Sequence, residues 1–130
     1  LHPIERYVDG FRALRADNPE RLFVVPIVGV PPDLTSHTAV VDYESILSDS
    51  RMTVSVNPLR FGQLRPSCEV PLRTSASPPH RFVRLARDLG DQALLESICE
   101  EDFSVTTEAI LERLGTRIRE IGCNGAEIEP

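Results

Sequence analysis

The stretch Leu22-Phe23-Val24-Val25-Pro26-Ile27-Val28-Gly29-Val30 decides the fold class, because it is a nearly unbroken apolar run rich in β-branched residues. Such a run is typical of a strand that is covered on both faces, as in a parallel sheet. Pro26 departs from this pattern, since proline has no N–H to donate to a ladder and prefers edges or bulges. We therefore expect a strand over 22–30 with a bulge or an edge position at Pro26.

The segments on either side of this strand alternate between helical and extended patterns. Apolar residues recur at helical spacing near the start of the chain, until Asp17-Asn18-Pro19 blocks continuation. The longest helical pattern places Ile110, Leu114, Ile118 and Ile121 on one face and ends at Gly122. Alternating helices and strands are typical of an α/β sandwich. The predicted helices cover about 3–15, 43–48, 81–89 and 104–121, and a second strand covers 93–99.

The insertion over about 31–79 separates the two strands and contains seven of the 11 prolines. A loop of this length is uncommon inside a compact domain unless it is functional or tied down. Two parallel strands also make no stable sheet alone, and the chain starts without Met inside a helical pattern. We therefore expect 1–130 to be a single α/β segment that forms part of a larger domain.

Composition narrows the classes of partner. The chain has 130 residues and a formal net charge of −6, which removes the usual electrostatic attraction to nucleic acids and anionic membranes. No apolar run approaches the roughly 20 residues of a membrane-spanning helix. We expect no nucleic-acid partner and no membrane insertion by this segment.

The three cysteines, Cys68, Cys99 and Cys123, have no C-x-x-C spacing that would indicate zinc or a thioredoxin-like site. A disulfide between Cys68 and Cys99 would close a loop of about 31 residues, stabilise the fold by roughly 3–4 kcal/mol and pin the insertion to the sheet. Cys123 would then need a partner elsewhere. The alternative is three unrelated thiols in a reducing compartment, and the spacing alone leaves both open.

Two groups of residues are candidates for chemical sites. Cys99 lies at a strand end, but His37 and His80 have no motif context that would make either a base for it. The acidic run Glu100-Glu101-Asp102 follows the same strand and could contribute oxygen ligands to a hard cation. The same acids could instead complement the dipole of the following helix, with Asp102 or Ser104 as its cap. No metal ligand and no catalytic residue is predicted.

Several segments share the character of one known family: 4–15, 18–25, 27–31, 43–52, 64–68, 79–90, 97–99 with 102–103, and the final helix. Together they resemble the later half of bacterial von Willebrand factor A-type domains, of the kind found in secreted or lipid-anchored surface proteins. The resemblance implies a Rossmann-like sheet with helices on both faces, whose earlier half is not in this sequence. The family's D-x-S-x-S metal-binding motif belongs to that earlier half, so a divalent cation is expected there and no cofactor in this segment. The family's cysteine pair matches Cys68 and Cys99, which supports a disulfide and an extracytoplasmic location.

The sequence therefore favours a non-enzymatic protein-binding or adhesion module outside the cytoplasm. Its expected partner is another protein or the missing half of the same domain, recognised at a crest formed by Glu100, Glu101 and Asp102 and by the long insertion. A second hypothesis is a structural subunit that completes a larger assembly. A third is a hydrolase or transferase that uses Cys99.

Overall fold

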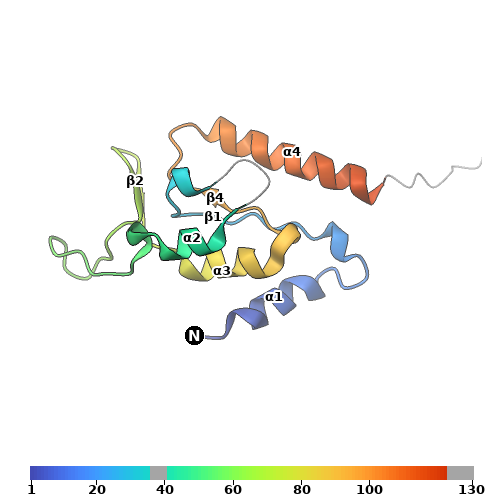
Figure 1. Ribbon diagram of the computed structural model, residues 1–130, viewed down its shortest axis with the longest axis horizontal. Helices are drawn as coiled ribbons and strands as arrows, with labels where there is room; N and C mark the ends of the chain where they lie inside the picture. The colour runs from blue at the N-terminus through green and yellow to red at the C-terminus, as the bar shows by residue number, and fades with distance from the viewer. Residues whose placement is uncertain (36–40, 123–130) are drawn as a thin grey trace, which may run out of the picture.

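A computed structural model describes residues 1–35 and 41–122. Within them the chain is a mixed α/β structure (Figure 1). His37 and Cys123 lie outside the described residues. The helices and strands are α1 Ile4–Ala13, β1 Ile27–Val28, α2 Tyr43–Ser48, β2 Cys68–Val70, β3 Thr74–Ala76, α3 His80–Leu89, β4 Glu96–Ser97 and α4 Phe103–Ile121, with short 3-10 helices η1 Pro19–Arg21, η2 Pro32–Leu34, η3 Ser50–Met52 and η4 Gly90–Gln92.

The two strands expected from the apolar runs pair with each other in parallel, with Ile27 opposite Glu96. An isolated parallel bridge between Val24 and Ala93 extends the contact toward the start of both runs. Pro26 interrupts the ladder between these two pairings. Its carbonyl still accepts a hydrogen bond from Glu96 N at 3.0 Å, but proline has no N–H to complete the ladder. Regular strand structure is therefore confined to two residues on each side.

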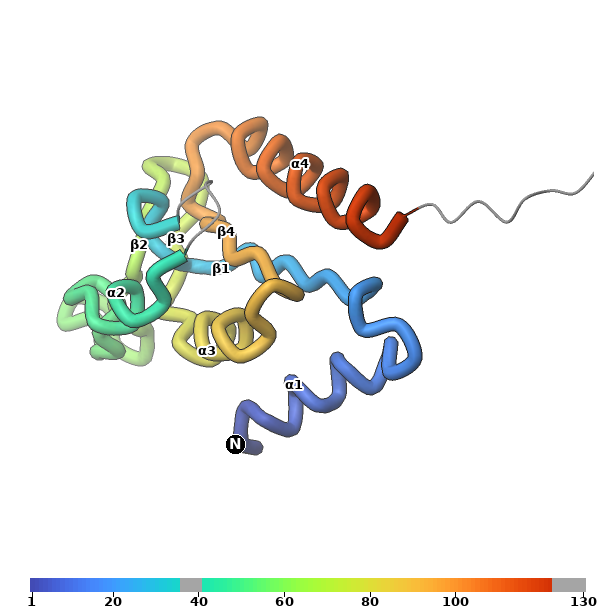
Figure 2. Tube along the Cα trace, turned by 45° about the vertical axis from the view of Figure 1, so that its right-hand side comes forward, coloured from blue at the N-terminus to red at the C-terminus, as the bar shows by residue number. Residues whose placement is uncertain are grey.

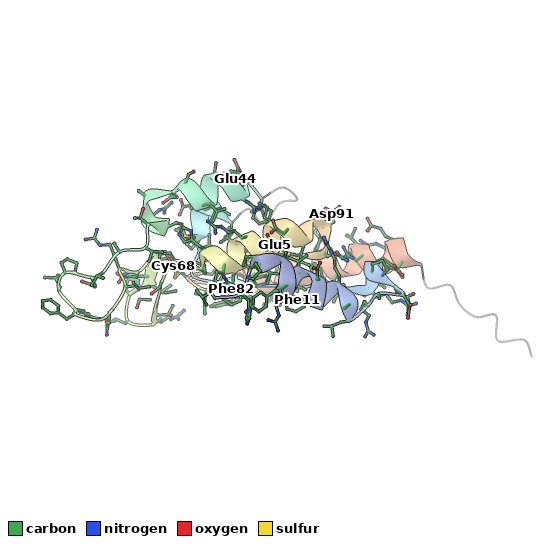
Figure 3. All side chains as sticks on the ribbon, turned by 90° about the horizontal axis from the view of Figure 1, so that it is seen from below. Glu5, Phe11, Glu44, Cys68, Phe82 and Asp91 are labelled. Carbon is green, nitrogen blue, oxygen red and sulfur yellow. A yellow bond between two sulfur atoms is a disulfide. The ribbon has the colours of Figure 1, made fainter. Side chains whose placement is uncertain are left out.

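The helices form layers on both sides of this small sheet, with α4 on one side and α1, α2 and α3 on the other (Figures 1 and 2). The core lies between the sheet and α3, where Val83, Ala86, Leu95 and Val30 are completely buried. Figure 3 shows α1 lying alongside α3, with Phe11 and Phe82 on the two helices. The hydrophobic core is thus concentrated on one face of the sheet.

Both long helices that glycine was expected to end do end there. Gly90 follows α3 with a φ of 60°, and Gly122 follows α4 with a φ of 64°. Only glycine adopts this left-handed region without a steric penalty. No helix among the described residues has the length and apolarity that crossing a bilayer would require.

The insertion contains more structure than the single short helix that the sequence predicted. Besides α2 it holds η2 and η3, the antiparallel pair β2–β3, and a second hairpin-like loop closed by a bridge between Val56 and Leu64. These pairings are too short to produce a visible alternation of apolar and polar residues. The expectation of a largely irregular loop over 31–79 is therefore corrected.

The expectation that the strand at 22–30 is covered on both faces is also corrected. Ile27 is 40% exposed, and Val25 is only half-buried. Side chains of a strand alternate between faces, and Val24 and Val28 pack against the core. Val25 and Ile27 therefore point to the opposite face, where α4 covers them only in part.

Candidate functional site

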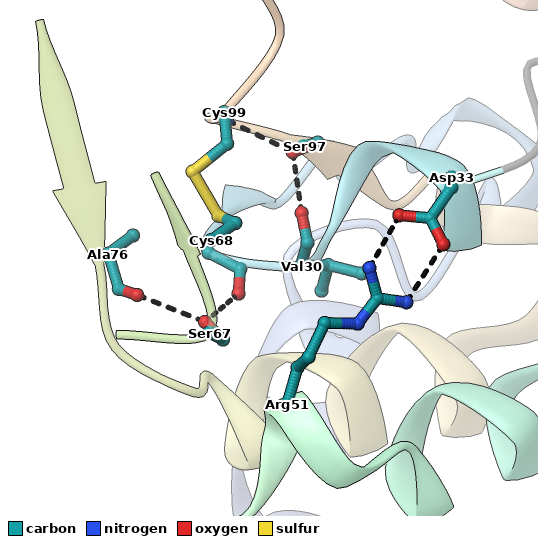
Figure 4. The surroundings of a disulfide bond; sticks show 9 residues. Val30, Asp33, Arg51, Ser67, Cys68, Ala76, Ser97 and Cys99 are labelled. Carbon is teal, nitrogen blue, oxygen red and sulfur yellow. Dashed lines mark hydrogen bonds and ion pairs between the residues drawn. A yellow bond between two sulfur atoms is a disulfide. The ribbon is translucent and has the colours of Figure 1, made fainter. Parts of the chain in front are cut away.

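The carboxyl ends of β1 and β4 meet the insertion at a disulfide between Cys68 and Cys99 (Figure 4). Cys68 begins β2, and Cys99 follows β4 by two residues, so the bond ties the insertion to the sheet. The pairing that the sequence suggested is thus present in the structure. The bond therefore explains how so long an insertion is held against the sheet.

Two buried serines reinforce this junction. Ser67 Oγ donates to the carbonyl of Gly29, and its backbone N donates to Ala76 O at 2.8 Å. Ser97 Oγ donates to Val30 O at 2.5 Å and accepts from Cys99 N at 3.0 Å. Each hydroxyl donates to a backbone carbonyl just beyond the carboxyl end of β1, where the ladder provides no partner. Both serines therefore have structural partners and neither is positioned as a free nucleophile.

The acidic run at the end of β4 divides between two roles. Asp102 is the N-cap of α4, because its Oδ1 accepts from Ser104 N at 2.9 Å. That backbone hydrogen bond, followed by one from the Ser104 side chain, holds the pKa of Asp102 below its usual value. Glu101 is exposed, and its carbonyl accepts from Arg73 Nη1 at 3.0 Å. Asp102 rather than Ser104 is thus the cap, and the insertion touches the crest through Arg73.

No group of three His, Cys, Asp or Glu side chains that could hold a metal ion occurs in residues 1–35 and 41–122. Cys99 is 3% exposed and its sulfur is bonded to Cys68, so it has no thiol to deprotonate in the oxidised chain. His80 Nε2 lies 2.5 Å from Met52 O, which ties α3 to η3. These positions give structural roles to Cys99, His80 and Asp102.

Arg51 forms a second tie within the insertion. Its guanidinium is bidentate to Asp33, with both N–O distances 2.8 Å, and it also contacts Asp49 at 2.9 Å (Figure 4). These bonds lower the pKa of Asp49 to about 2, with the side-chain hydrogen bond from Arg51 as the largest cause. Arg51 thereby joins η2 to η3 at the exposed side of the molecule.

The face of the sheet beneath α4 is incompletely covered. Thr106 is the buried residue of α4, while Leu111, Leu114 and Ile118 on the same helix are 61%, 38% and 49% exposed. Arg117 helps to attach the helix, because it donates to the carbonyls of Asp91, Glu20 and Leu22 and lies over the Phe23 ring. An apolar helix face and an apolar sheet face thus stand next to each other with much of both exposed.

In the part of the chain that the structure describes, no strand pairs with the outer edge of β1 beside this face. Residues 24, 26 and 28 form the ladder with β4, so the backbone groups of Val25 and Ile27 point away from it. Within the described part of the chain those groups form no backbone hydrogen bond. An open edge with an apolar neighbouring face is a template for a further strand.

The insertion places large apolar side chains at the end of the molecule opposite the end of α4 (Figure 1). Leu59 and Phe61, at the tip of the loop between Val56 and Leu64, are 90% and 96% exposed. Leu72, at the turn between β2 and β3, is fully exposed and has a φ of 63°. An open groove of about 490 Å³ lies between the two hairpins and is lined by Asn57, Leu59, Arg60, Gln63, Leu64, Pro66, Glu69, Ser75, Ala76 and Ser77.

Sequence reasoning overlooked one feature of this region, the completely buried Glu96 in β4. It lies opposite Ile27 in the register and therefore on the α4 side of the sheet. A carboxyl group inside a predicted strand was the signal that could have drawn attention to it, because a buried charge is costly unless it is partnered.

Comparison of the chain with protein-family models, with curated proteins and with solved structures gave no match. The resemblance to von Willebrand factor A-type domains therefore stays a prediction, and a function for this chain has to be inferred from its own geometry.

Proposed function

We propose that the chain is a non-enzymatic protein-binding module that acts outside the cytoplasm, and that it binds a strand of another protein chain at the open edge of β1. The observation that carries this proposal is the exposed edge at Val25 and Ile27 beside an apolar helix face that nothing in the described structure covers. A parallel sheet of two strands is marginal by itself. An added strand would supply the backbone partners that the edge lacks.

The chemistry of the face indicates the kind of strand. Ile27 and Leu114 present aliphatic surface on the sheet and on α4. A strand that paired with β1 would place every second side chain between the sheet and α4. The expected partner segment is therefore extended and apolar at alternate positions, with its backbone paired to Val25 and Ile27.

The disulfide supports a location outside the cytoplasm, because such bonds persist in oxidising compartments. Blocking free thiols before and after denaturation tests this part. We expect Cys68 and Cys99 to resist blocking in the protein isolated from its own cells under alkylating conditions. Three reactive thiols would refute the location.

Photo-crosslinking tests the binding surface. A photoreactive amino acid placed at Ile27 or at Leu111, in the cells that make the protein, should capture the same polypeptide from both positions. The matched control is Arg84, an exposed residue of α3 in the opposite helix layer. The captured protein is then purified, and its affinity is measured against the original chain and against Ile27→Asp.

We expect Ile27→Asp to weaken that affinity at least tenfold, because a carboxylate on the docking face would have to be desolvated. Capture from Arg84 alone, no capture from either site, or an affinity that Ile27→Asp leaves unchanged would overturn the proposal. Light scattering on the isolated chain addresses the structural-subunit alternative. Obligate co-folding with the captured protein would favour that alternative over a module that binds as a folded monomer.

A further inference from the structure

We propose that the two hairpins of the insertion attach the chain to the surface of a lipid bilayer that contains anionic phospholipid. These hairpins form a hairpin lobe, residues 53–77. It lies at one end of the molecule, where the loop between η3 and β2 projects away from the helices (Figure 1). This surface is separate from the open β1 edge, so the inference goes beyond the proposed protein-binding function.

The first observation is the exposure of three large apolar side chains at the tips of the two hairpins. Leu59 and Phe61 are 90% and 96% exposed, and Leu72 is fully exposed. Scattered single exposed apolar residues need no explanation, but here three of the four most exposed large apolar residues occupy the turns of the two hairpins, Leu1 being the fourth. Convex tips of this kind can enter the boundary between headgroups and acyl chains without reshaping the protein.

The second observation is the separation of charge along the chain. The hairpin lobe contains three arginines, Arg60, Arg65 and Arg73, against the single acid Glu69, while the whole chain carries −6. Arg60 and Arg65 are exposed and have no ion pair within the described residues. By contrast, Arg51 and Arg87 elsewhere pair with carboxylates. The lobe is thus locally cationic, and the remainder of the acidic chain would be repelled from an anionic surface.

The third observation is the conformation of Leu72. Its φ of 63° lies in the left-handed region that glycine or asparagine normally occupies. A bulky leucine there accepts a steric cost, yet its side chain contributes nothing to the core because it is fully exposed. The turn sets this backbone conformation, because Arg73 N donates to Val70 O at 3.1 Å and the third residue of such a turn takes a positive φ. The turn does not require a large apolar side chain at that position, and insertion into lipid would give the leucine a role there.

These observations favour a bilayer over a protein partner for the hairpin lobe. The apolar groups stand on tips that project, and the groove between the hairpins is lined mainly by polar side chains such as Asn57, Gln63 and Ser75. A protein partner would have to enclose each tip separately. A bilayer can receive each tip in its headgroup region while its phosphates contact the flanking arginines.

The test uses the full chain and vesicles of phosphatidylcholine, either alone or with about 30% phosphatidylglycerol. Because the chain contains no tryptophan, Phe61→Trp adds a single reporter at the tip. We expect its emission to shift to shorter wavelength when anionic vesicles are added, and brominated acyl chains to quench it. High salt should reverse the binding to a large extent.

Variants separate the two contributions. Leu59→Ser with Phe61→Ser should lower the vesicle partition coefficient at least tenfold, because both side chains lose apolar burial. Arg60→Gln with Arg65→Gln should lower it about thirtyfold on anionic vesicles only, at roughly fivefold for each arginine near the surface. Leu14→Ser and Arg84→Gln are the matched controls, since both positions are exposed and lie outside the lobe and outside the β1 and α4 surface.

All four variants replace exposed residues, so urea midpoints close to that of the original chain are expected to show that they fold. No emission change with anionic vesicles at low salt would overturn the inference. The inference would also be overturned if the chain bound uncharged vesicles as tightly as anionic ones and the arginine variants did not change that binding. Binding of the Phe61→Trp tip to an acidic protein in the absence of lipid response would reassign the lobe to a protein partner, while the crosslinking at Ile27 would remain unaffected.

Discussion

Removal of the Cys68–Cys99 disulfide is the perturbation whose effect the structure predicts most directly. The bond joins residues 31 positions apart, and the loop-entropy model gives a stabilisation of about 3.5 kcal/mol for a loop of that length. A double variant, Cys68→Ala with Cys99→Ala, should therefore lose about this much free energy of unfolding. Urea unfolding followed by far-ultraviolet circular dichroism should show a midpoint lower by roughly 2 M.

The single variants distinguish crosslinking from side-chain packing. If the bond acts by restricting the unfolded chain, Cys68→Ala and Cys99→Ala should each lose nearly as much stability as the double variant. All the proteins would carry Cys123→Ser, so that no thiol exchange occurs during unfolding. A loss below about 1 kcal/mol in the double variant would refute the reasoning. So would a loss confined to Cys99→Ala, because that pattern would reflect only the packing of a side chain that is 3% exposed.

Three further predictions concern acid sensitivity, the attachment of α4 and the contact between β1 and β3. Because its native pKa of about 2 lies below the ordinary value of 3.8, Asp49 contributes stability that is complete above about pH 4 and is lost as the pH falls toward 2. Asp49→Asn should therefore cost roughly 0.5–1 kcal/mol at pH 6 and much less at pH 2.5 in urea titrations, and an equal cost at both pH values would contradict the assignment. Arg117→Gln removes charge-assisted bonds to three carbonyls and should weaken the docking of α4 by about 2 kcal/mol, seen as faster hydrogen exchange in α4 but not in α3. Gly29→Ala would bring a Cβ to 2.6 Å from Ala76 Cβ and should cost roughly 1–3 kcal/mol in thermal unfolding, whereas Gly10→Ala, which meets nothing within 4 Å, should not destabilise the chain.

The elements with strong periodicity were the ones that the sequence predicted well. The helices at α3 and α4 begin and end within a residue or two of their predicted bounds, since the apolar spacing and the terminal glycines Gly90 and Gly122 are local signals. Both apolar runs were predicted to be strands, although not to pair with each other, and the Cys68–Cys99 bond was also suggested. The strand lengths were not predicted. Pro26 shortens the ladder only if a carbonyl of the neighbouring strand faces its nitrogen, and the sequence does not show which edge of the strand is paired.

The features that matter most for binding depend on three-dimensional arrangement and left weaker traces in the sequence. The spacing of Leu114 and Ile118 predicted a buried helix face, but spacing cannot show that only Arg117 and a few other residues hold that face to the sheet. A net charge of −6 likewise describes the whole chain. It conceals the cationic hairpin lobe, because Arg60 and Arg65 are averaged with acids that lie elsewhere in space.

The register of the sheet also has a consequence for the order of folding. Ile27 and Glu96 pair although they lie 69 positions apart, so the sheet closes one of the longest loops in the chain and should form late. An oxidised Cys68–Cys99 bond gives a shorter covalent path between the two strands, of about 43 residues, which lowers the closure entropy enough to speed this step about twofold. The order of disulfide formation and sheet formation therefore matters. A chain that forms the Cys68–Cys99 bond early should pair β1 with β4 sooner and expose the unpaired strands for a shorter time.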